Sequence, residues 1–320
     1  MSTPLARRRE MLRALYGFDF PDDLFRFWEF ANRLRPLEPL AALADLLQIR
    51  LKGPFEVLAG RFDQRTPRYS LLLHWRYYND PPEFFTVLRG GIDGLHWGYY
   101  LDDPANHSGC VASYYTNDAF ELMTDGDTLF AALRLHLEYR HRDCLDYRDT
   151  DPEHAADYDA TLAELADLRG KVQRYETGDR PEVGEEYTEK YVAERRRAKQ
   201  VVAKTLDGMG IVAPRGLYRP LSLKDRKLWK VLLSEDDPAA PVEEARRALR
   251  DGFPATALKL GKDLWAVGGE RHTEYAYELL DSAYLALGRE DLREVLREHR
   301  AHRDLPVVDV LALEAGEPGV

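Results

Sequence analysis

Short runs of aromatic and branched residues, separated by strong turn signals, constrain the N-terminal half of the chain most. The runs cover residues 55–58, 69–75, 84–88, 95–100 and 111–114. The segments between them contain Gly-Pro, Asp-Pro-Pro, Gly-Gly and Asp-Asp-Pro, all of which favour turns. Runs of this length and composition, punctuated in this way, are typical of consecutive antiparallel strands. The sequence therefore predicts an antiparallel sheet in this half.

Helices are expected on both sides of this sheet. Within residues 1–50, Phe25, Trp28 and Phe30 recur near helical spacing, and acidic residues at 22–23 favour a helix start there. A further helix is expected at about 128–140, and beyond it helices at 242–250, 255–265 and 274–287. The predicted fold class is therefore α+β: an N-terminal antiparallel sheet with flanking helices, followed by a mostly helical C-terminal domain.

The length of 320 residues suits about two domains. We expect an N-terminal α+β domain at 1–145, a charged helical connector at 146–198 and a mostly helical C-terminal domain at 199–320. The connector is read as helical rather than as a flexible linker because its apolar residues keep a stripe. These residues are Leu162, Leu165, Leu168 and Val172.

The charge balance excludes several classes of protein. With 45 Lys and Arg against 56 Asp and Glu, the net charge is −11, which opposes general binding of nucleic acid. The basic run at 195–199 is interpreted as a solvated helix face.

No apolar run is long enough to span a bilayer, and no signal peptide is evident. Two cysteines in a chain of this length indicate a reducing compartment, which is the cytoplasm, or the nucleus in a eukaryote.

No familiar catalytic motif is present. The chain lacks a phosphate-binding glycine loop, a Gly-x-Ser-x-Gly elbow and a His-Glu-x-x-His pair, so we expect neither a cofactor nor a metal site. The segment 73–84 is read as a hairpin that feeds aromatic residues into the core. The alternative is a rim that presents Asp80 and Glu83, and a hydrolase that combines these with His74 is a third hypothesis.

Six motifs in order resemble signatures of the histone PARylation factors. They are GPFEVLAG at 53–60, LHWRYYNDPPEF at 73–84, WGYYLDDP at 97–104, KQVVAKTLDGMGIVAP at 199–214, YRPL at 218–221 and ALKLGKDLW at 257–265. The resemblance implies an accessory factor of the DNA damage response that binds the catalytic domain of a poly(ADP-ribose) polymerase and is not an enzyme alone. It also implies a composite active site, in which the factor supplies a glutamate as general base for a substrate serine.

The resemblance assigns roles to three residues of this chain. Tyr218 and Arg219 match the family's partner-binding pair, in which the arginine contacts the polymerase's C-terminal end. Counting back from Gly261 without a gap places Asp251 at the position of the catalytic glutamate. With a gap, Asp251 matches a later aspartate and no base remains, and Arg250 replaces the preceding acid.

Two readings of Asp251 therefore stay open. In the first, the Asp251 carboxylate is accessible beside Arg219, and these two residues share one exposed face with Tyr218. In the second, Asp251 is an ordinary turn residue before Gly252, and the protein is a non-catalytic, immunity-like regulatory module that keeps the fold.

Overall fold

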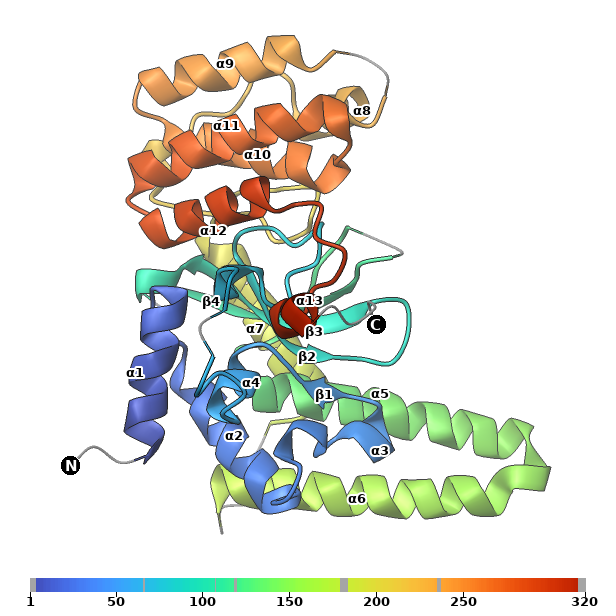
Figure 1. Cartoon of the computed structure of the whole chain (residues 1–320). Coiled ribbons are helices and arrows are strands. Elements are labelled where there is room, and N and C mark those ends of the chain that lie inside the picture. Colours follow the sequence, from blue (N-terminus) through green and yellow to red (C-terminus); the bar gives the residue numbers. More distant parts are fainter. Residues whose placement is uncertain are drawn as a thin grey trace.

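The computed structural model describes residues 4–65, 67–106, 108–117, 120–178, 184–234 and 237–315. The N-terminal part is built around one antiparallel sheet, and the C-terminal part is a stack of helices at one end of it (Figure 1). This confirms the predicted α+β class. Within the described residues, no helix is both long and apolar enough to cross a lipid bilayer.

The sheet has five strands in sequential order, and each neighbouring pair is antiparallel. The strands are β1 (Arg50–Leu51), β2 (Phe84–Arg89), β3 (Leu95–Asp103), β4 (Ser108–Tyr115) and β5 (Met123–Gly126). Three of the predicted runs, at 84–88, 95–100 and 111–114, lie in β2, β3 and β4 and are confirmed. Strands β1 and β5, which have only two and four residues, were not predicted.

Both faces of the sheet are covered, so β3 is buried along almost its whole length. Because side chains alternate along a strand, Trp97 and Tyr99 lie on one face and Tyr100 lies on the other. Trp97 and Tyr99 join the larger core, which the N-terminal helices share. Tyr100 belongs to a second cluster with Tyr114, and Met209 of the C-terminal part completes it. The sheet therefore lies between the N-terminal helices and the C-terminal part.

Four helices surround the N-terminal side of the sheet. They are α1 (Pro4–Tyr16), α2 (Asp22–Leu34), α3 (Ala44–Leu47) and α4 (Pro54–Leu58), with 3₁₀ turns at Pro39–Ala41 and Leu71–Leu73. The predicted acidic start of α2 is present at Asp22. The next carboxylate, Asp23, accepts a hydrogen bond from the backbone N–H of Leu129 at 2.8 Å and so ties α2 to the helix that follows the sheet.

Two predicted strands, at 55–58 and 69–75, were wrong. Residues 55–58 lie in α4, because Pro54 occupies its first turn and Glu56 accepts a hydrogen bond from the Gly53 N–H at 3.2 Å. Residues 69–75 contain a 3₁₀ turn that Ser70 caps by accepting from the Leu72 N–H. A short apolar run does not distinguish a buried strand from a buried helical turn, and here the capping residues decide.

The predicted connector is helical. Helices α5 (Leu129–Thr150) and α6 (Ala155–Thr177) run side by side away from the sheet, joined by a 3₁₀ turn at Pro152–His154, and α7 (Glu186–Gln200) returns toward the C-terminal part (Figure 1). Three of the four predicted stripe residues are buried, and Leu162 packs against them while partly exposed. Helix α5 crosses the expected boundary at 145, and the three-domain division stays a prediction.

The basic run near the end of α7 is only in part the solvated face that was predicted. Arg195 and Arg196 are exposed, and Arg196 pairs with Asp127 at 2.7 Å. Arg197 is only 7% exposed, and it donates to both oxygens of Asp102 in β3 at 2.7 and 3.0 Å. The prediction was wrong for Arg197, because one residue in each turn of the helix faces the sheet.

The C-terminal part is centred on helix α10 (Pro254–Val267), which is buried from Pro254 to Leu264. Around it lie α8 (Asp225–Leu232), α9 (Ala239–Arg250), α11 (Glu270–Leu287) and α12 (Glu290–Ala301), and before them come β6 (Val201–Ala203), β7 (Ile211–Val212) and a 3₁₀ turn at Arg215–Leu217. The three predicted helices are confirmed within α9, α10 and α11. The final helix, α13 (Val310–Ala315), returns to the N-terminal part, where Trp75 N–H donates to the Val308 carbonyl at 2.7 Å.

Candidate functional site

Arg219 and Asp251 meet on the surface of the C-terminal part. Asp251 is the C-cap residue of α9, directly after Arg250, and the next residue, Gly252, takes a φ of +89° and reverses the chain. The guanidinium Nη2 of Arg219 donates to Asp251 Oδ2 at 2.9 Å, and the two side chains are 42% and 47% exposed. Two residues that are 32 positions apart therefore form one accessible pair of charges.

The position of Arg219 is fixed by the start of α10. Its backbone N–H donates to Thr256 Oγ1 at 3.0 Å, and the Thr256 hydroxyl donates back to the Arg219 carbonyl at 2.6 Å. The guanidinium lies over the ring of Phe253, 4.7 Å from the ring centre. A stacked guanidinium on an anchored backbone loses little freedom when it binds an anion. Neither Phe253 nor Thr256 was predicted as a site residue, although both follow Asp251 within five positions.

Tyr218 lines a groove next to this pair. The groove has a volume of about 830 Å³ and runs between α7, β6 and α8, with Trp229 and Asp225 on its wall. Burial, together with the nearby carboxylates of Asp225 and Asp263, raises the pKa of the Tyr218 hydroxyl. The backbone of Tyr218 is extended, so its side chain and that of Arg219 project to different sides.

The structure thus brings Arg219 and Asp251 together, as expected, and places Tyr218 in the neighbouring groove. Asp251 is accessible and also caps the C-terminal end of α9, so features of both hypotheses are present. The assigned roles of the three residues stay predictions.

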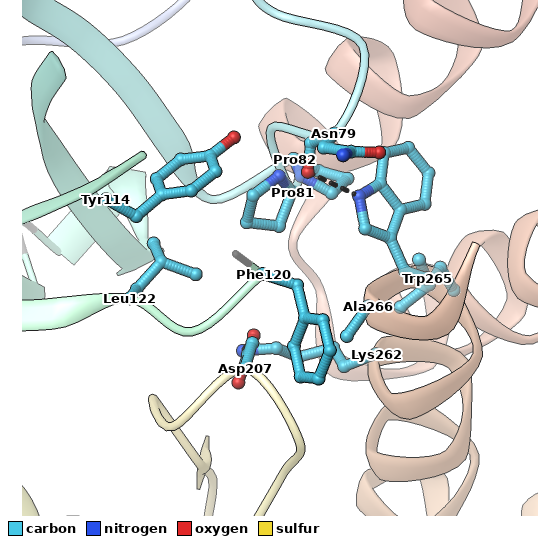
Figure 2. A pocket seen from close by; sticks show the side chains of 11 residues that line it. Asn79, Pro81, Pro82, Tyr114, Phe120, Leu122, Asp207, Lys262, Trp265 and Ala266 are labelled. Atoms are coloured by element: carbon cyan, nitrogen blue, oxygen red, sulfur yellow. Dashed lines mark hydrogen bonds and ion pairs between the residues drawn. The ribbon is translucent and has the colours of Figure 1, made fainter. Parts of the chain in front are cut away.

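A small enclosed cavity lies where the C-terminal part meets the sheet, with room for about one water molecule at 10 Å³ (Figure 2). The indole Nε1 of Trp265 donates to the Asn79 carbonyl at 3.0 Å, and Lys262 Nζ lies 3.1 Å from Asp207. The prolines at 81–82, the Tyr114 ring and the apolar side chains of Phe120 and Leu122 also line it. This cavity is too small for a substrate, and its polar groups join the two parts of the protein.

The three residues of the hydrolase hypothesis do not form a site. Asp80 is 0% exposed, lies 3.1 Å from His96 Nε2 and accepts from the Tyr114 hydroxyl. Burial raises its pKa, but His96, Arg76 and the Tyr114 hydroxyl together outweigh this and lower it. The rim reading of 73–84 was therefore wrong for Asp80, and it was also wrong for Glu83, which is 2% exposed and accepts from Tyr284 at 2.9 Å.

His74 belongs to a different buried cluster, in which its Nε2 lies 2.7 Å from Glu56. Burial alone would raise the pKa of Glu56, but His74, Lys52 and Arg61 lower it to about 2. The segment 73–84 contributes to the core, as the favoured interpretation predicted, although it forms turns rather than a hairpin.

Both cysteines are buried free thiols, and burial raises the pKa of Cys110 to about 12. Among the described residues, no group of three or more His, Cys, Asp or Glu side chains could hold a metal ion.

These features define an α+β protein that carries an accessible pair of charges beside a groove on its C-terminal part. Comparison with known proteins assigns the family. The sequence model described as Histone PARylation factor 1 matches residues 7–303. The chain therefore belongs to the histone PARylation factor family.

Its relatives include three proteins named Histone PARylation factor 1. The one from Mus musculus is 29% identical over 95% of this chain and 89% of its own length. Those from Bos taurus and Danio rerio are 28% and 30% identical, each over 95% of this chain and over 89% and 88% of their own lengths. The similarity therefore extends over nearly the whole of each protein.

Proposed function

We propose that this protein is an accessory factor that docks onto the catalytic domain of a poly(ADP-ribose) polymerase-like ADP-ribosyltransferase, through a surface that contains Arg219 and Tyr218. We further propose that Asp251 completes the active site as the general base for ADP-ribosylation of serine. The names of the relatives support the first statement. The observation that carries the second is the accessible ion pair between Arg219 and Asp251.

Arg219 is suited to bind a carboxylate, such as the C-terminal end of a partner chain. Its backbone is anchored on Thr256 and its guanidinium is stacked on Phe253, so its position is set before the partner arrives. In the free protein, Nη2 is directed at Asp251. A guanidinium has five donors, so Arg219 can bind a partner carboxylate in a fork and keep or release Asp251.

Asp251 is suited to take a proton. In the proposed step, the serine oxygen bonds to the sugar carbon of NAD that carries nicotinamide, nicotinamide leaves with the bonding electrons, and Asp251 accepts the hydroxyl proton. NAD is held by the transferase in this scheme. An acidic acceptor residue is already ionised and does not need this base, whereas a serine hydroxyl does.

The test is a modification assay with a transferase catalytic domain, NAD and a basic peptide that contains serine. Asp251→Ala should lower serine modification at least about a hundredfold while the complex still forms. Asp251→Glu should keep or raise the rate, because it restores the family's residue. The matched control is Glu278→Ala, which removes an exposed carboxylate of α11 that pairs with Arg246 and should change nothing.

The second candidate is a regulatory, immunity-like module that binds the transferase without supplying a base. The sequence favours it, because Arg250 replaces the acid that precedes the family's glutamate. If Asp251→Ala leaves serine modification unchanged while the complex forms, the module is the correct function. Both candidates place the protein with its transferase, in the cytoplasm of a bacterium or the nucleus of a eukaryote, without a membrane or direct contact with nucleic acid.

A further inference from the structure

A second, unassigned pocket opens on the face of the sheet that α5 covers. Side chains alternate along the strands, so this face presents Trp97 from β3, Ser113 and Tyr115 from β4, and Asp125 from β5. Helix α5 adds Tyr139. Together they line a pocket of about 280 Å³, far larger than the cavity shown in Figure 2.

Asp125 is the unusual residue of this pocket. It is 5% exposed, and within the described part of the chain its Oδ2 atom has no hydrogen-bond partner. Burial raises the pKa of Asp125 to about 6, although hydrogen bonding by Ser113 and Trp97 and the charge of Lys190 lower it. A buried carboxylate oxygen without a partner is costly, and most such groups in folded proteins find one. The missing partner points to a ligand.

The walls of the pocket indicate the kind of ligand. Three aromatic residues, Trp97, Tyr115 and Tyr139, line the same pocket as the Asp125 carboxylate. Aromatic rings attract cations through their faces, and a carboxylate among them adds a charge partner. His136, on the same wall, does not compete as a cation, because burial lowers its pKa to about 4.

Three further charged residues line the pocket: Arg142, Asp143 and Lys190. Arg142 donates to the Tyr187 hydroxyl at 2.9 Å and lies over the Tyr139 ring, so it is already engaged, and Asp143 beside it offsets its charge. Lys190 of α7 also lines the pocket. Its ammonium group partly offsets the negative charge of Asp125 and would compete with a cationic ligand. Removing this ammonium group therefore tests whether the charge of Asp125 binds the ligand.

We propose that this pocket binds an organic cation: an ammonium or guanidinium group on an aliphatic chain, as in a lysine or arginine side chain. The site is built from the N-terminal part and α7, so it does not depend on the function proposed for Arg219 and Asp251. The ligand has two sources, a free amine or a side chain of a basic polypeptide, and they share this chemistry.

The experiment is calorimetric titration of the full chain without any transferase. The probes are the N-acetyl methylamides of lysine and arginine, their neutral analogues from norleucine and citrulline, and a peptide with a single lysine. We expect the cationic probes to bind with a Kd of about 1 mM or below and the neutral analogues not to bind. A peptide at least about tenfold tighter than the amide identifies a polypeptide ligand, and equal affinities identify a free amine.

Two variants should change the affinity in opposite directions. Asp125→Asn, which keeps the shape of the side chain, should weaken binding at least about tenfold, whereas Lys190→Met should tighten it. The matched control is Asp127→Asn, two positions further along, whose carboxylate pairs with Arg196 outside the pocket. A purely structural role for Asp125 predicts no tightening in Lys190→Met.

The affinity should also depend on pH. The groups that face Asp125 are Lys190 and Glu194 on α7, with His136, Arg142 and Asp143 on α5. Asp125 itself changes charge near pH 6, so the affinity for the cationic probes should rise about tenfold between pH 5 and pH 7.5. The proposal is overturned if no cationic probe binds, or if folded Asp125→Asn binds as tightly as the wild type.

Discussion

Replacing Arg197 by methionine should destabilise the protein more than any other change on α7. The Arg197 side chain donates to both Asp102 oxygens, at 2.7 and 3.0 Å, and its Nε donates to the Met209 carbonyl at 2.8 Å. One residue of the predicted connector therefore joins β3 to the loop before β7. The charge and hydrogen bonds of Asp102 raise the pKa of Arg197 despite the opposing effect of burial.

The magnitude follows from the partner that the substitution leaves behind. Asp102 is 3% exposed, so Arg197→Met leaves a buried carboxylate without its counter-charge. Breaking a buried ion pair in this way costs about 3 to 5 kcal/mol, a large part of the roughly 5 to 15 kcal/mol that stabilises a typical domain. Replacing both partners, as in Arg197→Met with Asp102→Leu, should recover most of this loss, because neither charge then stays buried.

The assay is urea denaturation followed by circular dichroism. The control is Arg196→Met, whose side chain is 58% exposed and pairs with Asp127, so about 0 to 1 kcal/mol should be lost. The reasoning is refuted if Arg197→Met costs less than about 1 kcal/mol, or if the double variant is as unstable as the sum of the single ones.

Three further changes are predicted. Because the pKa of Glu56 is lowered to about 2, the ionised carboxylate adds about 3 kcal/mol to the free energy of unfolding above pH 4.5, and this is lost as pH falls toward 2. Glu56→Gln should lose this stabilisation at pH 7, and its stability should fall less steeply in acid. The pKa of Asp125 is raised to about 6, so its ionisation destabilises the fold by about 3 kcal/mol as pH rises from 4 to 7. Asp125→Asn should therefore gain stability relative to the wild type over this range, as thermal denaturation at pH 4 and pH 7 would show. The same stability difference between variant and wild type at both pH values would contradict this prediction. Asp251→Glu should raise the rate of serine modification by up to about a hundredfold if the shorter aspartate misplaces the carboxylate by about 1 Å, and a slower variant would argue against Asp251 as base.

Much of the fold follows from the sequence, because the longer elements repeat their pattern. Strands β2 to β4 and helices α9 to α11 lie where alternation or helical spacing predicted them. The two wrong strands were short, and their conformation depends on capping contacts of Glu56 and Ser70. A pattern of apolar residues contains no information about such contacts.

The candidate site was predictable only in part. Asp251 and Arg219 were singled out by resemblance, and their pairing was expected, but nothing in the sequence near Arg219 indicates that Thr256 and Phe253 hold it. The pocket around Asp125 was missed for a similar reason. Its residues come from three strands and two helices, and only the register of the sheet brings Trp97, Ser113 and Asp125 to one face.

The most direct test of the proposed docking is the affinity of the free chain for the catalytic domain of a poly(ADP-ribose) polymerase, measured by calorimetry for the wild type and Arg219→Ala. We predict that the wild type binds and that Arg219→Ala binds about 10- to 100-fold more weakly, because a charge-assisted contact of about 1.5 to 3 kcal/mol is lost. Arg246→Ala, which removes a partly exposed arginine paired with Glu278, should bind like the wild type. Equal affinities for Arg219→Ala and the wild type would contradict the account.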